Sequence, residues 1–171
     1  MAGTYEPIST VTTTGTPASI DFTSIPQTYT DLVLVFVNTG SAGVVGVRTR
    51  FNNDSSAIYD KMYVFAQNSS ISRGQQTNAT SYNAIASGLH EYAESWINIC
   101  NYSNTNTFTT LLSRLTGTGD AGSSWTTRDT RSWYDTGRWR STAAVTSINL
   151  SPDSGNFAVG TIVTLFGIKK A

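Results

Sequence analysis

The chain has 171 residues, enough for one domain, and only 13% of them are charged. Eleven Lys and Arg side chains balance eleven Asp and Glu, so the formal net charge at pH 7 is zero. This balance argues against general binding to nucleic acid or to an anionic membrane, because both depend on cationic side chains. One cysteine excludes an intramolecular disulfide, and no signal peptide or membrane-spanning apolar run is present, which predicts a soluble chain made in the cytoplasm.

The first third of the chain predicts short β-strands separated by turns. Residues 5–13 are rich in Thr and Val, and residues 18–22 alternate between apolar and polar side chains. Residues 32–37, LVLVFV, are apolar on both faces, as in a central strand that is covered on two sides. In the next run, we expect Val45, Val47, Thr49 and Phe51 to face one way, and Arg48 and Arg50 to face the other.

The remaining pattern also favours β structure. An aromatic run at 58–65 is followed by a long polar region from 67 to 83, in which no strand is predicted. Residues 95–103 and 107–117 flank an Asn/Thr turn and predict a hairpin, and two final strands are predicted at 142–150 and 160–170. No segment has a sustained helical stripe. We therefore predict an all-β fold: a single antiparallel β-sandwich or jelly-roll domain over residues 1–171, with about eight to ten strands and at most a short N-terminal arm.

The residues that usually carry catalysis are sparse. His90 is the only histidine, and HEYAE lacks the second histidine of a zinc-protease helix. Glu91 and Glu94 are the only closely spaced glutamates, and they serve equally well to solubilise a loop. Asp54 and Asp60 could ligate calcium, but Asx-rich turns use the same residues for structural reasons. We predict no catalytic residue, no cofactor and no metal.

The stretch from Thr127 to Arg140, TRDTRSWYDTGRWR, is the strongest candidate for a contact site. It holds four of the eight arginines and two of the four tryptophans, residue types that are enriched at interaction hot spots. Two aspartates offset two of these arginines, so contacts with other subunits, internal packing and an external ligand all remain open. As a strand that includes Trp125 just upstream, the stretch places two sets of side chains on opposite faces: Trp125, Arg131, Trp133 and Asp135 on one, and Ser132, Tyr134 and Thr136 on the other.

Three segments resemble a family of tailed-bacteriophage virion structural proteins. The ending WRSTAAVTSINLSPDSGNFAVGTIVTLFGIKKA is similar to the family's "sGNFaaGs" turn and its closing strand "LYGIK", with Phe166 in place of Tyr and Thr161 in place of Ser. SIPQTYTDLVLVF at 24–36 resembles "IPqtYtDLvl", and residues 47–67 resemble "lRFNgDsgsnYs", with Asn53 where Gly is usual. The resemblance spans most of the chain from Tyr5 onward.

The resemblance implies a non-enzymatic, all-β virion component that assembles as a homotrimer. The leading hypothesis is a capsid decoration, or cement, protein that bridges neighbouring subunits of the major capsid protein. The alternative is a tail-fibre or baseplate module that binds host surface glycans through a platform of Trp133, Tyr134, Arg138 and Trp139. A glycan hydrolase is the most distant alternative, because no persuasive acid/base pair is present.

The predicted partners are therefore virion subunits, and not nucleic acid or membrane, with a host glycan as the partner in the alternative. We expect Trp139 to lie inside the sandwich. The candidate contact surface comprises Arg128, Arg131, Trp133, Tyr134 and Arg138.

Overall fold

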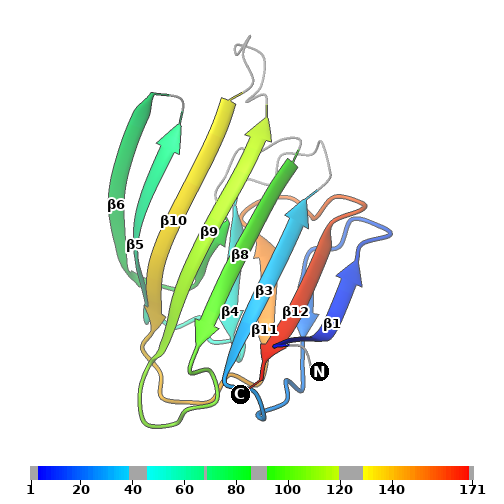
Figure 1. The fold of residues 1–171 in the computed structure, drawn as a ribbon, viewed down its shortest axis with the longest axis vertical. Coiled ribbons are helices and arrows are strands. Elements are labelled where there is room, and N and C mark those ends of the chain that lie inside the picture. The colour runs from blue at the N-terminus through cyan, green and yellow to red at the C-terminus, as the bar shows by residue number, and fades with distance from the viewer. Residues whose placement is uncertain (1–3, 39–45, 68, 86–91, 120–128, 170–171) are drawn as a thin grey trace.

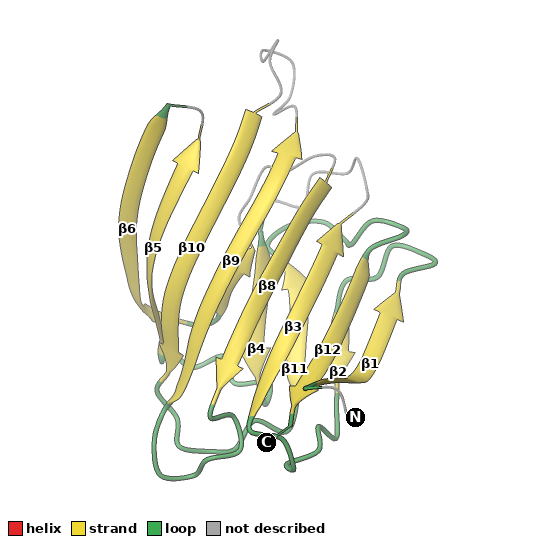
Figure 2. Ribbon diagram, in the orientation of Figure 1, coloured by secondary structure: helices red, strands yellow, loops and turns green. Residues whose placement is uncertain are grey.

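The protein, seen here as a computed structural model, folds into two antiparallel sheets (Figures 1 and 2). The structure describes residues 4–38, 46–67, 69–85, 92–119 and 129–169, and none of these is helical. The all-β sandwich that the sequence predicts is confirmed. Twelve strands form within the described residues, compared with the eight to ten expected.

Eight strands form the large sheet and four form the small sheet. In spatial order, the large sheet contains β1 (Tyr5–Thr12), β12 (Ile162–Ile168), β3 (Asp31–Asn38), β8 (Tyr92–Cys100), β9 (Thr109–Gly119), β10 (Asp129–Trp139), β5 (Tyr59–Gln67) and β6 (Ser70–Ala79). The small sheet contains β2 (Ile20–Phe22), β11 (Ile148–Pro152), β4 (Val47–Phe51) and β7 (Tyr82–Ile85).

Successive segments of the chain alternate between the two sheets, as they do in a jelly roll. The exceptions are the hairpin β5–β6 and the meander β8–β9–β10, which stay within the large sheet and widen it. The hairpin predicted around the Asn/Thr turn is confirmed as the pairing of β8 with β9.

The additional strand β6 lies in the polar region from 67 to 83, where no strand was predicted. Eight of its ten side chains are exposed, on both faces, so the segment has no apolar alternation to reveal it. Its strand conformation comes from pairing with β5, a contact that local sequence does not encode.

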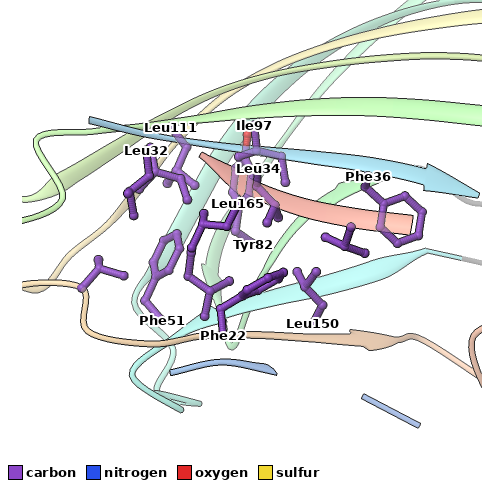
Figure 3. Packing of buried hydrophobic residues seen from close by; sticks show 14 of the residues in the cluster. Phe22, Leu32, Leu34, Phe36, Phe51, Tyr82, Ile97, Leu111, Leu150 and Leu165 are labelled. Carbon is purple, nitrogen blue, oxygen red and sulfur yellow. The ribbon is translucent and has the colours of Figure 1, made fainter. Parts of the chain in front are cut away.

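The hydrophobic core lies between the sheets (Figure 3). Leu32, Leu34 and Phe36 point inward from β3, and Phe22, Phe51 and Leu150 meet them from the small sheet. The same alternation appears in β4, where Val47, Thr49 and Phe51 are buried and Arg48 and Arg50 are half-buried, as predicted. No described segment is a helix that is long and apolar enough to cross a membrane.

Three strands of the large sheet project beyond the small sheet (Figure 1). We call these strands, β10, β5 and β6, the wing. The small sheet reaches the base of the wing through β7, which contacts β9, β10 and β5. Most of the stretch that the sequence singled out forms β10, Asp129–Trp139, the strand of the wing that pairs with β9.

Candidate functional site

The side chains of the wing point alternately to its two faces. We call the face that turns away from the small sheet the outer face. Tyr134 of β10 lies opposite Arg114 of β9 and Val64 of β5, and Val64 lies opposite Arg73 of β6. These four side chains therefore form one row across four neighbouring strands of the outer face.

Five exposed apolar side chains cluster on this outer face, and we call them the outer patch. They come from all four strands, and their exposed fractions are 64% for Met62, 47% for Val64, 78% for Ile71, 51% for Leu112 and 62% for Tyr134. Four of the five line a hollow of about 680 Å³, together with Arg73 and Gln75. Large apolar side chains that are exposed next to one another are characteristic of interaction surfaces.

The outer patch is bordered by an aromatic–arginine pair. The guanidinium of Arg114 lies 4.9 Å from the ring centre of Trp96, and the Trp96 indole donates a hydrogen bond to Glu94. This cation–π contact covers one face of the indole ring. Trp96 therefore already has intramolecular partners, whereas the outer patch beside it remains open.

The inner face of the wing carries a separate aromatic cluster. The rings of Trp133 and Phe65 are stacked, with centroids 4.3 Å apart and an interplanar angle of 16°. Tyr63 packs against Trp133 at 6.3 Å. All three residues are half-buried, so Trp133 contributes to the packing of the wing.

A buried carboxylate lies next to this cluster on the same face. Asp135 is 2% exposed, and one of its oxygens has no hydrogen-bond partner within the described residues. Burial raises the pKa of Asp135 to about 6, although Lys61 and the hydroxyl of Ser113 partly oppose the rise. The Lys61 ammonium donates a hydrogen bond to the Asn83 carbonyl at 2.6 Å, and burial lowers the pKa of this lysine. Burial therefore makes the charged form of Asp135 energetically unfavourable.

This carboxylate should make stability depend on pH. The pKa of Asp135 is higher in the folded protein, about 6, than its ordinary value of 3.8, so the folded state binds more protons between these values. The free energy of unfolding should therefore fall by roughly 2 to 3 kcal/mol as pH rises from about 4 to 7. In Asp135→Asn this fall should disappear. Urea denaturation of both proteins across that pH range measures the difference.

Subtracting the two curves removes the contributions of other titrating groups. Asp21→Asn, the same change at an exposed position on β2, is the matched control for the substitution itself. A parallel pair of curves for wild type and Asp135→Asn would show that Asp135 is not the source.

The structure divides the predicted contact residues between different environments. Tyr134 and Arg138 lie on the outer face, whereas Trp133 lies on the inner face, so they do not form one surface. Arg138 forms an ion pair with Asp60 at 2.9 Å. Arg128 lies outside the described residues, and for Arg131 only the backbone, within β10, is described.

The glycan-binding platform expected from the sequence is wrong, because its four residues do not lie on one exposed surface. Trp139 is 1% exposed and its indole donates a hydrogen bond to Asp54, which confirms that it lies inside the sandwich. Trp133 and Tyr134 are consecutive residues of a strand, and their side chains point in opposite directions. The four side chains therefore cannot stack on one sugar chain.

The two aspartates weighed as calcium ligands are bound by protein donors. Asp54 accepts hydrogen bonds from the Ser56 backbone and from Trp139, and Asp60 accepts from the Asn78 backbone and from Arg138. Burial raises the pKa of both carboxyl groups, but the hydrogen bonds that they accept lower it by more. The pKa of each therefore lies below its ordinary value. No group of three or more potential metal ligands occurs in the described part of the chain. His90 and Glu91 lie outside that part.

Sequence reasoning missed most of the outer patch. Met62, Val64 and Leu112 lie in runs that were expected to be strands, but no partner strand was known for them. The available signal was alternation: in LLSRL, the buried residues Leu111, Ser113 and Leu115 alternate with exposed Leu112 and Arg114. Ile71 lies in β6, which gave no strand signal.

No family model and no curated protein matches the chain. Two solved structures are similar to it at a low level. One is a protein of unknown function from Shewanella oneidensis MR-1, with 11% identity over 99% of this chain and 78% of that chain, and a TM-score of 0.22. The other is an engineered GH43 glycoside hydrolase with endo-xylanase and exo-arabinofuranosidase activity, with 13% identity over 83% of this chain and 30% of that chain, and a TM-score of 0.26. These TM-scores carry no functional argument.

Proposed function

We propose that the protein is a non-enzymatic structural component of a bacteriophage virion, and specifically a capsid decoration protein. The observation that carries the proposal is the outer patch, in which five exposed apolar side chains from four adjacent strands form one surface. Such a surface favours a protein partner, because aliphatic side chains lose water on contact with other apolar groups.

The sequence supports the same proposal. The resemblance to phage virion proteins rests on segments in β3, β4, β5, β11 and β12, and of the outer patch these segments contain Met62 and Val64 but not Ile71, Leu112 or Tyr134. The partner that fits the patch is a capsid subunit with an apolar surface flanked by acidic groups that complement Arg73 and Arg114. Binding that exists only in the assembled shell would stabilise the shell.

Location and copy number in the particle test this function. Quantitative mass spectrometry of virions and of tail-less heads should find the protein in many copies that remain with the heads. A few copies that follow the tails would replace the decoration role with a tail-fibre or baseplate role.

A matched pair of substitutions tests the outer patch itself. Val64 is 47% exposed within the patch, and Val159 is 57% exposed in the loop before β12, outside it. Val64→Glu should weaken binding to heads that lack the protein by roughly ten-fold or more, because it places a charge in an apolar contact. Val159→Glu should bind like the wild type.

Thermal unfolding of both variants shows that they are folded before binding is compared. If the two substitutions reduce binding equally, or if neither does, the outer patch is not the contact surface.

A further inference from the structure

The edge of the wing is the least protected sheet edge in the described structure. β1, at the opposite end of the large sheet, contains Pro7 with a register shift beside it. The edges of the small sheet are short, with three residues in β2 and four in β7. β6 has ten residues and no proline, Arg73 is its only charged side chain, and its register shift lies beyond Gln76, near its C-terminal end. Proline, bulges and short length are the features that normally keep an edge strand from pairing.

One contact at the base of the wing shows which residues of β5 hydrogen-bond to β10 and which bond to β6. The Arg140 amide donates to the Ile58 carbonyl at 2.9 Å, and these residues continue the β10–β5 register by one position. Hydrogen-bonded and non-hydrogen-bonded pairs alternate in an antiparallel ladder. Even-numbered residues of β5 therefore bond to β10, and odd-numbered residues bond to β6.

The direction of the β6 backbone follows from this alternation. Tyr63 and Phe65 of β5 lie opposite Gly74 and Ser72 of β6, so the backbone of Gly74 and Ser72 faces β5. The backbone N–H and C=O groups of the alternate residues face away from the sheet; these residues are Ile71, Arg73 and Gln75. Within the described residues, no strand pairs with this edge.

We propose that β6 pairs antiparallel with β6 of a second copy of this chain, with the two Gly74 residues at the two-fold axis. The same edge then supplies equal numbers of donors and acceptors to both copies, which is the requirement for an isologous contact. In this register, Arg73 of each copy lies opposite Gln75 of the other, and the amide oxygen of Gln75 accepts from the guanidinium.

Charge selects this register over its neighbours. A shift that centred the pair on Arg73 would place two guanidinium groups directly opposite each other, which destabilises a sheet. A shift that centred it on Ser72 would place Arg73 opposite Ile71, without a polar partner. Pairing about Gly74 also brings the outer patches of the two copies into one continuous face, because Ile71 and Val64 lie on that side of the wing.

Sedimentation of the full chain at micromolar concentration tests the proposal. The wild type should form a dimer, and Gln75→Pro should be monomeric, because proline removes an outward N–H from the contact. Gln75→Ala retains that N–H and should remain a dimer. A wild-type monomer, a wild-type trimer, or a dimer that survives Gln75→Pro would overturn the proposal.

Charge variants test the register without removing a backbone donor. Gln75→Glu places a carboxylate opposite Arg73 of the partner and should tighten the dimer, whereas Gln75→Arg should weaken it. Each change acts at two symmetry-related pairs, so the dissociation constant should shift by about two- to thirty-fold in either direction.

Ser9→Glu and Ser9→Arg, on the opposite edge strand β1, are the matched controls and should leave the dimer unchanged. If the Ser9 and Gln75 variants change the dissociation constant equally, the effect comes from net charge and not from the β6 contact. If Gln75→Glu and Gln75→Arg shift the dissociation constant in the same direction, the proposed register is wrong. The two-fold contact at β6 differs from the homotrimer that the resemblance implies, and these measurements need no capsid, so they stand or fall separately from the proposed decoration function.

Discussion

Replacing Trp139 by Ala should lower the free energy of unfolding by roughly 3 to 5 kcal/mol, the usual cost of removing a large buried aromatic ring. The indole is 1% exposed, stacks on Tyr59 with centroids 6.4 Å apart, and meets Phe51 edge-on at 5.6 Å. Its N–H donates to Asp54 at 3.1 Å. Removal leaves both a cavity and a carboxylate without this donor. Guanidinium denaturation measures the loss.

Two further variants separate the contributions. Trp139→Phe keeps an aromatic ring and loses the N–H, so its loss should be smaller than that of Trp139→Ala. Trp133→Ala removes the same side chain from the half-buried inner cluster, and it should also cost less because less surface leaves the interior. A loss at Trp133 equal to that at Trp139 would contradict the assignment of Trp139 to the core.

Adding a single methyl group at Gly137 should cost roughly 3 kcal/mol, at the upper end of the range for overpacked cores. Gly137 faces inward on β10, and a Cβ there would collide with the ring of Tyr82 and lie 2.7 Å from the Asp60 carbonyl oxygen. The ring of Tyr82 is fixed on its far side, where its hydroxyl hydrogen-bonds to Ser113 at 3.1 Å. Gly137→Ala should therefore shift the thermal midpoint downward by roughly 6 to 12 °C.

Gly15→Ala is the matched control, because a Cβ at that position meets no atom within 4 Å. It should leave the midpoint unchanged. Combining Gly137→Ala with Tyr82→Leu tests the cause, since removal of the ring should make the combined loss smaller than the sum of the two single losses. If the two single losses simply add, the strain in Gly137→Ala does not come from the Tyr82 ring.

Alternation allowed much of the fold to be predicted from sequence. The faces of β4 follow directly from its residues, because Val47, Thr49 and Phe51 are buried whereas Arg48 and Arg50 are half-buried. β6 could not be predicted in this way, because water contacts both of its faces and no side-chain pattern distinguishes it from a polar loop. Its existence depends on β5, with which it pairs from Gln67 and Ser70 onward.

The candidate site was predicted only in part, for a different reason. The opposite directions of Trp133 and Tyr134 follow from strand geometry, but their neighbours do not. Trp133 meets Phe65 and Tyr134 meets Val64 because β10 pairs with β5, a strand about seventy positions earlier in the chain. The register between such distant segments is set by the whole sheet, so the outer patch emerges only in three dimensions.

The two faces of β10 also differ in how freely their residues can be substituted. Trp133, Asp135, Gly137 and Trp139 point into the protein and are constrained by packing, whereas Ser132, Tyr134 and Thr136 point outward. Changes at the outward positions can alter what the surface recognises without altering the interior. A strand built in this way lets the outer face diversify at every second residue while the fold stays unchanged, and it offers three randomisable positions for selecting new binders.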